Sequence, residues 1–410
     1  MRTTLCVLLA LLLTLSGCAV NEVIQAEETT LVVAEAPPEE ESLLDIGIIQ
    51  FHDGVEEDND PQDSGIYDEI RAAESRYLAY HLKQTMQSAG HWGAVRVIPG
   101  ANAFTDVLIN GRIIESDGEF ITLEIDVTDA SGLYWYSKQY ATQTGVSSYS
   151  INRDKRNDPY QKVFNDIAND LHNYVAQLPP EYVHRIRQVS ELQFFADMSP
   201  RPYAEYLQAN DEGNYVPVRL PAENDPAVAR LRQIRERDRL VVDTLNEHYA
   251  NFYYGIAIPY HSWRKTAREE SVNYRQVKRS ATMQTLLGAV VLAGSLAVDT
   301  DQGGKQSRRI NRSLQFIGIN EGINTMFRGV TRRSEARIHL ESIKELSESF
   351  GAEAAPMVVS VEGQSRRLTG TAAAQYDSWR RILREIYEAE TGFIETDELE
   401  APERIPESGG

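Results

Sequence analysis

The first half of the chain carries both hydrophobic periods of regular structure. Residues 121–127 alternate apolar and polar side chains, which predicts a strand with one buried and one solvated face. Residues 67–88 place apolar side chains at helical spacing, and Asp158-Pro159 is typical of a helix start. The full predicted series is a strand at 43–51, a helix at 67–88, strands at 95–98, 107–115, 121–127 and 133–140, and a helix at 158–178. These elements predict a small α/β sandwich domain over residues 43–178, in the order β-α-β-β-β-β-α, with both helices on one face of the sheet.

The second half of the chain predicts mainly helices. A long helix starts at Asp225-Pro226, and we expect a bend in it at Gly255 and Pro259. The other elements are a helix at 181–198, a short strand at 357–363 and a helix at 371–390. The expected divisions are a helical domain at 179–350, a C-terminal strand and helix within 351–390, and an acidic disordered tail at 391–410. The predicted fold class is α+β.

A stretch without charged residues, 280–298, stands out in the helical half. Its length is marginal for a membrane span, and small residues recur on it at helical spacing. A second small-residue face lies within 314–330, so the two segments predict a helical hairpin at 280–330. The residues assigned to helix packing or self-association are Gly288, Ala293, Ser295, Gly318, Gly322 and Gly329. Three interpretations stay open: burial in a soluble helical domain, self-association, and contact with an anionic membrane.

Basic residues lie on both sides of the hairpin arms. Residues 264–337 hold 14 basic and 6 acidic residues, a net charge of +8. The candidate contacts to an anionic surface are Arg275, Lys278, Arg279, Arg308, Arg309 and Arg312. A separate Arg-rich face at 230–239 could bind phosphate, but a solvated face paired with nearby acidic residues is favoured.

Aromatic residues are dense at 249–263, beside Arg264 and Lys265. Such a cluster could stack on a ligand or lie at a membrane interface. The favoured interpretation is a packed core between helices.

The chain is acidic, with 61 Asp and Glu against 41 Lys and Arg among 410 residues, a net charge of -20. The acidity is concentrated at the ends, because residues 18–70 hold 16 acidic residues and no Lys or Arg. Residues 385–410 hold 9 acidic residues and one Arg. The body between them is slightly basic, so charge alone does not exclude nucleic acid as a partner. That exclusion rests on the N-terminal signal.

The first 18 residues read as a secretion signal. Arg2 precedes an apolar run at 5–13 that is too short to span a membrane. The sequence Leu15-Ser16-Gly17-Cys18 resembles the lipobox of bacterial lipoproteins. The resemblance implies removal of residues 1–17 and acylation of Cys18. Because Ala19 stands where inner-membrane lipoproteins commonly have Asp, it further implies the outer membrane.

The segment at 18–42 follows this signal and is rich in Glu. We expect it to be a lipidated acidic tether, extended and mobile, because it holds too little apolar area to offset its ordering entropy. Cys6 leaves with the signal peptide, so a disulfide or a Cys-based zinc site in the mature chain is not expected.

Part of the α/β domain resembles a known periplasmic domain. The segments that carry the resemblance are 107–113, 121–127, 129–132 and 167–171. They are similar to the domain shared by the TolB N-terminus, the curli-secretion lipoprotein and the penicillin-binding-protein activator lipoproteins. The resemblance covers about a third of the chain and rests on pattern. It implies a binding or assembly domain without catalysis.

Catalytic and metal-binding patterns are weak. The eight His residues show no ligand pair at i,i+4, and Ser262 with Lys265 fits S-x-x-K without the companion motifs. Residues 299–304 begin like a calcium loop, but Ile310 stands where a bidentate Glu is needed. We therefore expect no catalytic residues, no metal site and no cofactor, and a protein that is not an enzyme.

These observations predict a periplasmic lipoprotein anchored in the outer membrane, a non-enzymatic assembly, scaffold or export-accessory component of the cell envelope. The expected partners are outer-membrane lipid through acylated Cys18, another envelope protein or peptidoglycan, and further copies of the chain, with no nucleic acid. Two alternatives stay open. One is a regulator that activates a peptidoglycan synthase or another envelope enzyme, and the other is an envelope hydrolase of unrecognised type.

Overall fold

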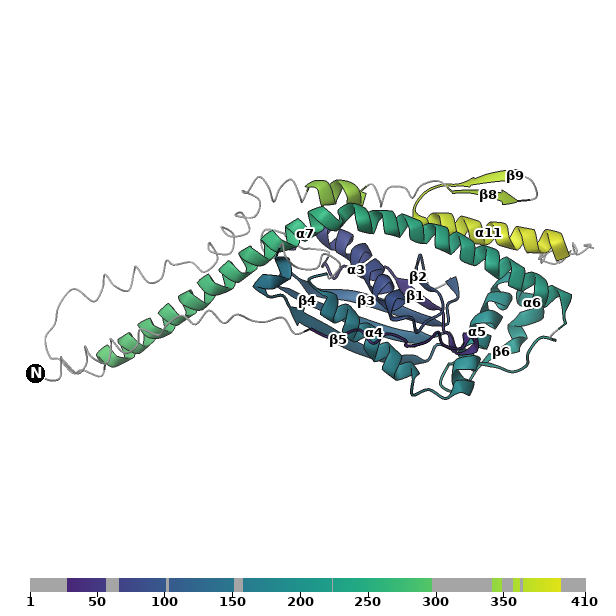
Figure 1. Ribbon diagram of the computed structural model, residues 1–410, viewed down its shortest axis with the longest axis horizontal. Helices are drawn as coiled ribbons and strands as arrows, with labels where there is room; N and C mark the ends of the chain where they lie inside the picture. Colours follow the sequence, from purple (N-terminus) through teal and green to yellow (C-terminus); the bar gives the residue numbers. More distant parts are fainter. Residues whose placement is uncertain are drawn as a thin grey trace, which may run out of the picture.

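A five-stranded sheet forms the centre of the first half of the molecule (Figure 1). The computed structural model describes residues 28–56, 66–100, 103–150, 158–222, 224–296, 341–348, 357–361 and 364–391, and of 276–296 only the backbone. The strands are β1 (Ile46–Ile49), β2 (Val95–Ile98), β3 (Val107–Ser116), β4 (Phe120–Asp129) and β5 (Tyr134–Gln143). Their spatial order is β2-β1-β3-β4-β5. Strand β1 is parallel to both β2 and β3, whereas β4 is antiparallel to both β3 and β5.

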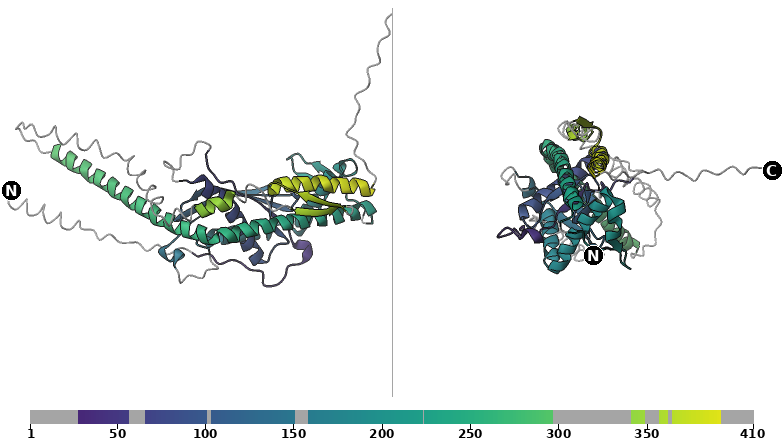
Figure 2. Two further views of the ribbon diagram at one scale, coloured as in Figure 1. Left: turned by 90° about the horizontal axis from the view of Figure 1, so that it is seen from above. Right: turned by 90° about the vertical axis from the view of Figure 1, so that its right-hand side faces the viewer.

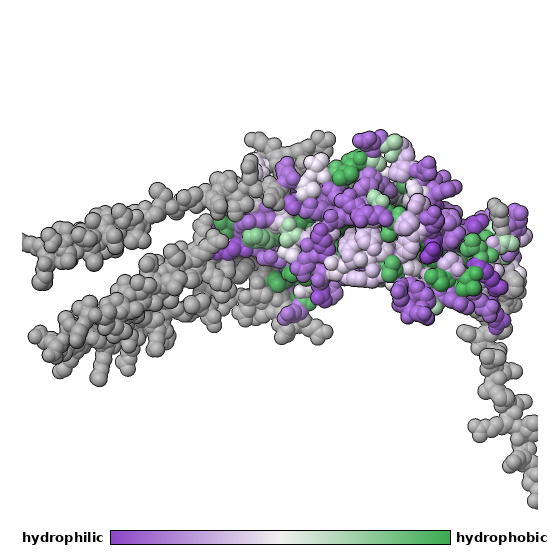
Figure 3. Space-filling model, turned by 90° about the horizontal axis from the view of Figure 1, so that it is seen from below, coloured by the Kyte–Doolittle hydropathy of each residue, from purple (hydrophilic) through white to green (hydrophobic). Residues whose placement is uncertain are grey.

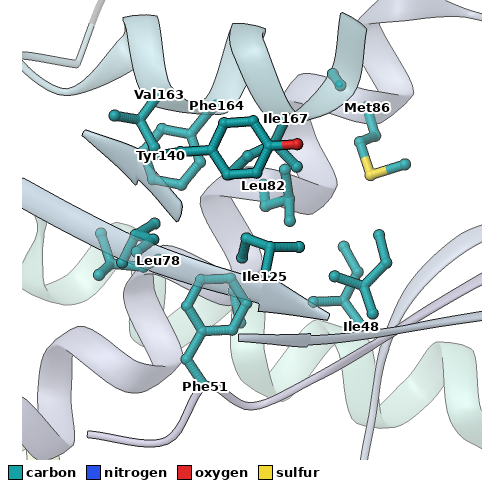
Figure 4. Packing of buried hydrophobic residues seen from close by; sticks show 14 of the residues in the cluster. Ile48, Phe51, Leu78, Leu82, Met86, Ile125, Tyr140, Val163, Phe164 and Ile167 are labelled. Carbon is teal, nitrogen blue, oxygen red and sulfur yellow. The ribbon is translucent and has the colours of Figure 1, made fainter. Parts of the chain in front are cut away.

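Two helices cover one face of this sheet, α3 (Asp68–Ala89) and α4 (Gln161–Val175). The expected order β-α-β-β-β-β-α is therefore confirmed. Inward residues of β4 such as Leu123 and Ile125 are fully buried, and Figure 4 shows Ile125 packed near Leu78 and Leu82 of α3. α3 ends at Gly90, which takes the left-handed conformation that a helix C-terminus favours, with φ of 72°.

The rest of the described chain is mainly helical, so the fold is α+β. A second core joins three helices, α5 (Pro180–Met198), α7 (Pro226–Leu296) and α11 (Ala372–Thr391). Short elements complete this half: α6 (Pro200–Tyr203), the hairpin of β6 (Leu207–Ala209) and β7 (Tyr215–Pro217), and the hairpin of β8 (Met357–Val361) and β9 (Gln364–Leu368). The expected strand at 357–363 is one arm of a hairpin. The sequence missed β6, β7 and β9, which are short and lack a clear apolar alternation.

α7 is a single helix of 71 residues that runs through Pro259. A proline ring clashes with the carbonyl four residues earlier, and that carbonyl belongs to Gly255. Gly255 is exposed, and a Cβ atom there would meet nothing within 4 Å, so water can reach its carbonyl. The helix is therefore continuous through Gly255 and Pro259, where we expected a bend, and Figure 2 shows it changing direction as it leaves the body.

The segment that precedes β1 lies against the body. The Asn165 side chain of α4 donates to the Thr29 carbonyl at 2.7 Å, and Asn169 binds both the Thr30 carbonyl and the Val32 amide. The Ala34 amide donates to the last residue of α3, and Leu31 packs against the first core. Residues 28–34 are extended, as expected of a tether, but they are held by α3 and α4 rather than free.

The two expected domains share one helix. Phe252, Ile256 and Tyr260 of α7 belong to the core of the sheet, whereas Leu231 and Leu245 belong to the second core. α7 therefore contributes to both cores of the described chain. Of the predicted hairpin, 280–296 is helical backbone at the end of α7, which includes Gly288, Ala293 and Ser295. The remaining hairpin residues, Gly318, Gly322 and Gly329, and the ends at 1–27 and 392–410 lie outside the described residues.

Candidate functional site

A buried ion pair holds α7 against the α/β core. The Arg264 guanidinium donates to both oxygens of Asp158, each at 2.8 Å, and the two side chains are 1% and 5% exposed. Burial alone would raise the pKa of Asp158, but the guanidinium more than offsets it, so the pKa of this carboxyl lies well below its ordinary value. The same pairing raises the pKa of Arg264 against the effect of its own burial. Both groups are therefore charged.

Aromatic rings surround this guanidinium. Its central carbon lies 4.2 Å from the ring centre of Tyr260 and 5.0 Å from that of Tyr160. The Tyr77 hydroxyl donates to Asp158 at 3.0 Å. Ring faces attract a cation, and the effect is larger where water is excluded. The rings therefore replace part of the hydration that Arg264 loses on burial.

The turn between β3 and β4 fits closely over this pair. The Gly118 amide donates to the Tyr160 hydroxyl at 3.0 Å, and Gly118 has a φ of 84°. A Cβ atom at Gly118 would lie 2.3 Å from the Arg264 carbonyl oxygen. Glycine is thus required at this turn, both for its backbone conformation and for the close approach of α7.

Glu74 of α3 forms a second buried centre beside Arg264. Its Oε1 accepts from Ser116 at 2.6 Å and from Tyr260 at 2.8 Å, and Arg71 lies 3.8 Å from Oε2. Burial raises the pKa of Glu74. A hydroxyl beside a carboxylate could serve as a nucleophile and base, but Ser116 is 8% exposed and Glu74 is fully buried. The arrangement binds α3, β3 and α7 together and offers a substrate no access.

His81 of α3 completes the network. One ring nitrogen, Nδ1, lies 2.7 Å from the Tyr253 hydroxyl, and Nε2 lies 2.9 Å from the side-chain amide oxygen, Oε1, of Gln161. Since Gln161 accepts there, Nε2 carries the proton and Nδ1 accepts from Tyr253. Burial lowers the pKa of His81, so the neutral ring is the folded form.

A second junction joins the first part of α7 to the end of the sheet. Arg235 donates to Ser190 of α5 at 2.6 Å and to the Phe104 carbonyl at 3.2 Å, and Arg239 binds Asp45 at 3.0 Å. A cavity of about 20 Å³ lies between them, with room for one water molecule. Asp238 lines this cavity, and burial raises its pKa. The size of the cavity excludes an organic ligand.

α11 is tied to α5 and α7 by charged groups. Arg380 pairs with Asp197 of α5 and lies 3.3 Å from Asp238 of α7. The Tyr376 hydroxyl also donates to Asp238, at 3.0 Å. Asp238 therefore joins α7 to α11 through two partners.

The structure places the Arg-rich face of α7 in ion pairs. Arg232 binds Glu191 of α5, and Arg230 and Arg237 bind Glu390 of α11. Paired charges are thus confirmed, but of the acidic residues within the face only Glu236 pairs with one of these arginines, Arg239. The other partners belong to neighbouring elements.

Among the predicted contacts to an anionic surface, Arg275 is the residue whose side chain the structure describes. Its guanidinium, assigned from the sequence to an anionic surface, instead binds Asp117 and Glu119 at the β3–β4 turn. The side chains of Lys278 and Arg279, and Arg308, Arg309 and Arg312 entirely, lie outside the described residues, as do the lipobox residues Leu15, Ser16, Gly17 and Cys18. The sequence analysis named Arg264 only as a neighbour of the aromatic cluster and did not single out Glu74 or His81, whose only signal was an ionisable residue on an apolar helix face.

The aromatic cluster is mostly core, as favoured from the sequence. Tyr249, Phe252, Tyr260 and Trp263 are buried, whereas Tyr254 is 63% exposed. The last of these is the one aromatic residue within 249–263 with a largely solvent-facing ring.

The outer face of the sheet on its β3–β5 side, away from the second core, is the candidate interaction surface. Arg112, Glu124 and Gln139 lie opposite one another across β3, β4 and β5, and Tyr134 is 52% exposed. β5 is the last strand in the order of the sheet, so its outer edge has no strand partner among the described residues. Seen from below in Figure 3, hydrophobic residues form small separate groups among hydrophilic ones. Polar contacts and strand pairing are thus what this surface offers.

Metal and membrane sites were sought over the same residues. In the described ranges, no three His, Cys, Asp or Glu side chains are grouped so as to hold a metal ion. No helix within those ranges is both long and apolar enough to cross a bilayer.

Comparison with known proteins gives little. No family model and no curated protein matches the chain. Among solved structures it is similar to a PelC dodecamer from Paraburkholderia phytofirmans, with 16% identity over 38% of this chain and 96% of that one, at a TM-score of 0.18. A score this low supports no conclusion about this chain.

Breaking the buried pair tests its role. Arg264→Met leaves Asp158 charged and unpaired, so we expect it to lower the free energy of unfolding by about 3–5 kcal/mol. Asp158→Asn should cost a similar amount, and the double variant less than the sum of the two. Urea unfolding measures all three.

A matched control is Arg232→Met on the same helix, whose ion pair with Glu191 is partly exposed. It should cost less than about 1 kcal/mol. Equal costs for Arg232→Met and Arg264→Met would contradict the role of the buried pair.

His81 predicts a pH dependence. Its folded pKa is lowered by burial, so the unfolded state binds more protons as the pH falls through the ordinary His value of about 6.5. The stability that His81 contributes is present above that value and is lost below it. His81→Gln should lower stability near neutral pH, where its hydrogen bonds are lost, yet reduce the loss between about pH 7.5 and 5.5. If urea unfolding shows the same pH dependence of the free energy of unfolding for His81→Gln as for the unchanged protein, another group causes that dependence.

Proposed function

We propose that the protein is a lipoprotein anchored in the outer membrane, facing the periplasm, and that it acts as a non-enzymatic assembly, scaffold or export-accessory component of the cell envelope. The observation that carries the proposal is the N-terminal sequence. An apolar run is followed by Leu15-Ser16-Gly17-Cys18, which matches the chemistry of lipid attachment to a cysteine thiol. Acyl chains on Cys18 would hold the protein at the membrane surface.

The paired charges of the described core support a binding role. Asp158, Arg264, Glu74 and His81 are buried and joined to protein partners, an arrangement that stabilises a body and leaves a substrate no access. The outer face and free edge of the sheet are the surfaces left for a partner. The partner we propose is another envelope protein or a further copy of this chain.

The ordered start of the chain bears on the alternative of a regulator. With residues 28–34 bound to the body, ten Cα–Cα steps separate Cys18 from Glu28. Fully extended they span at most about 33–36 Å. A regulator that must reach across the periplasm from the outer membrane would need a longer free tether, so this geometry favours a partner near the membrane.

Lipidation is tested by replacing its acceptor. Cys18→Ala should abolish incorporation of labelled fatty acid and leave the protein outside the outer-membrane fraction, because the thioether cannot form. Ser16→Ala, which keeps the thiol, is the control and should be labelled normally. Fatty-acid labelling that survives Cys18→Ala would refute the anchor.

Partner binding is tested by photocrosslinking in cells. A photoreactive amino acid in place of Gln139, exposed on the outer face of β5, should give a discrete adduct with an envelope protein or a second copy. The same replacement of the exposed Asn173 on α4 is the control and should give none. Identical results at the two positions would mean that the outer face of the sheet is not the binding surface.

A further inference from the structure

The ordered start of the chain and the departing end of α7 lie at the same end of the molecule. The Thr29 carbonyl is bound by Asn165, in the first half of α4. α4 begins beside Tyr160, which accepts from Gly118 of the β3–β4 turn. Asp117 and Glu119 of that same turn bind Arg275, the last residue of α7 with a described side chain. The membrane tether and the end of α7 therefore leave the body close together.

Beyond Arg275, α7 projects away from the sheet (Figure 1). The 21 residues that follow Arg275, up to Leu296, add about 32 Å of helix. From residue 280 onward this arm contains no Asp, Glu, Lys or Arg, and residues 286–296 read Leu-Leu-Gly-Ala-Val-Val-Leu-Ala-Gly-Ser-Leu. The last described residues of the arm, 286–296, which we call its tip, are thus uncharged and largely apolar.

The tether sets how far this end of the body can be from the bilayer. The ten Cα–Cα steps from Cys18 to Glu28 span at most about 33–36 Å. That limit is close to the length of the arm. When the tether is less than fully extended, an arm that points at the membrane therefore contacts the membrane. A flexible chain of ten residues has a typical span of only about 16–19 Å.

The opposite orientation does not fit. The part of α7 that lies along the body, Pro226 to Arg275, covers 50 residues or about 74 Å. If the arm pointed away from the membrane, a body of that length would have to fit into a gap of at most about 36 Å. The arm therefore points toward the bilayer or lies parallel to it, and the orientation toward the bilayer brings its tip to lipid.

We propose that residues 286–296 of α7 enter the leaflet that carries the Cys18 anchor, as a second contact with the same membrane. The proposal rests on the proposed lipid anchor. Eleven helical residues extend about 16 Å, half of a hydrocarbon core of about 30 Å, so the tip fits one leaflet and does not span. A bilayer surface is the partner that the tether geometry brings to the tip, whereas a second copy of the chain is brought there by no observed contact.

The test uses the acylated full-length protein in vesicles. Acylation blocks the Cys18 thiol, so Ala289→Cys provides the one free thiol of the mature chain for an environment-sensitive dye. Glu247→Cys, exposed on the same helix beside the body, is the matched control. Vesicles that contain lipids with a quencher in the acyl chain should quench the dye at 289 several-fold more than the dye at 247.

The outcomes separate the two proposals. Mass spectrometry and co-flotation read the anchor: a free Cys18 thiol and no flotation would overturn the proposed function and, with it, the geometry used here. If the acylated protein floats but the dye at 289 is quenched no more than the dye at 247, the membrane contact alone is wrong. Protection of the dye at 289 that depends on protein concentration and not on quencher lipid would assign the tip to a second copy. Val291→Asp, added to Ala289→Cys, should abolish the lipid quenching while flotation persists.

Discussion

The bidentate ion pair between Arg264 and Asp158 fixes how the two halves of the molecule meet. α7 is long enough to lie on the sheet domain in many positions along its axis, and apolar contacts alone distinguish poorly between neighbouring ones. A guanidinium buried at 1% exposure is tolerated in one position, where it meets a carboxylate and three tyrosine rings. A shift of α7 by one turn would leave both charges buried and unpaired, at a cost of several kcal/mol. The pair therefore selects a position more than it adds stability.

The remaining contacts of α7 follow from that position. Once Arg264 is seated, Arg275 falls on the β3–β4 turn, and Tyr253 and Tyr260 reach His81 and Glu74 of α3. Some 30 residues earlier on the helix, Arg235 and Asp238 meet α5 and α11. One helix thus carries the cores of both halves, and its arm leaves the body in a direction set by the same fit.

Local patterns in the sequence predicted the sheet domain well because each of its elements has a clean period. The alternation of 121–127 gave β4 its two faces, and Gly90 marked the end of α3. The ion pair escaped prediction because Asp158-Pro159 has a sufficient local explanation as a helix start. Asp158 does accept the Tyr160 amide at 2.9 Å, but the partner that decides its role is 106 residues away. The sequence predicts a free tether over 18–42 because that segment as a whole is rich in Glu, whereas within it residues 28–34 are held by hydrogen bonds from two asparagines of α4.

The central claim is that the sheet domain and α7 form one cooperative unit. Native-state hydrogen exchange, followed as a function of urea, measures the opening free energy of each backbone amide. Amides of α7 around residue 264 and amides of β4 should open with the same free energy and the same dependence on urea. A lower opening free energy for α7, with β4 still protected, would show that the helix separates from the sheet on its own and would contradict the account.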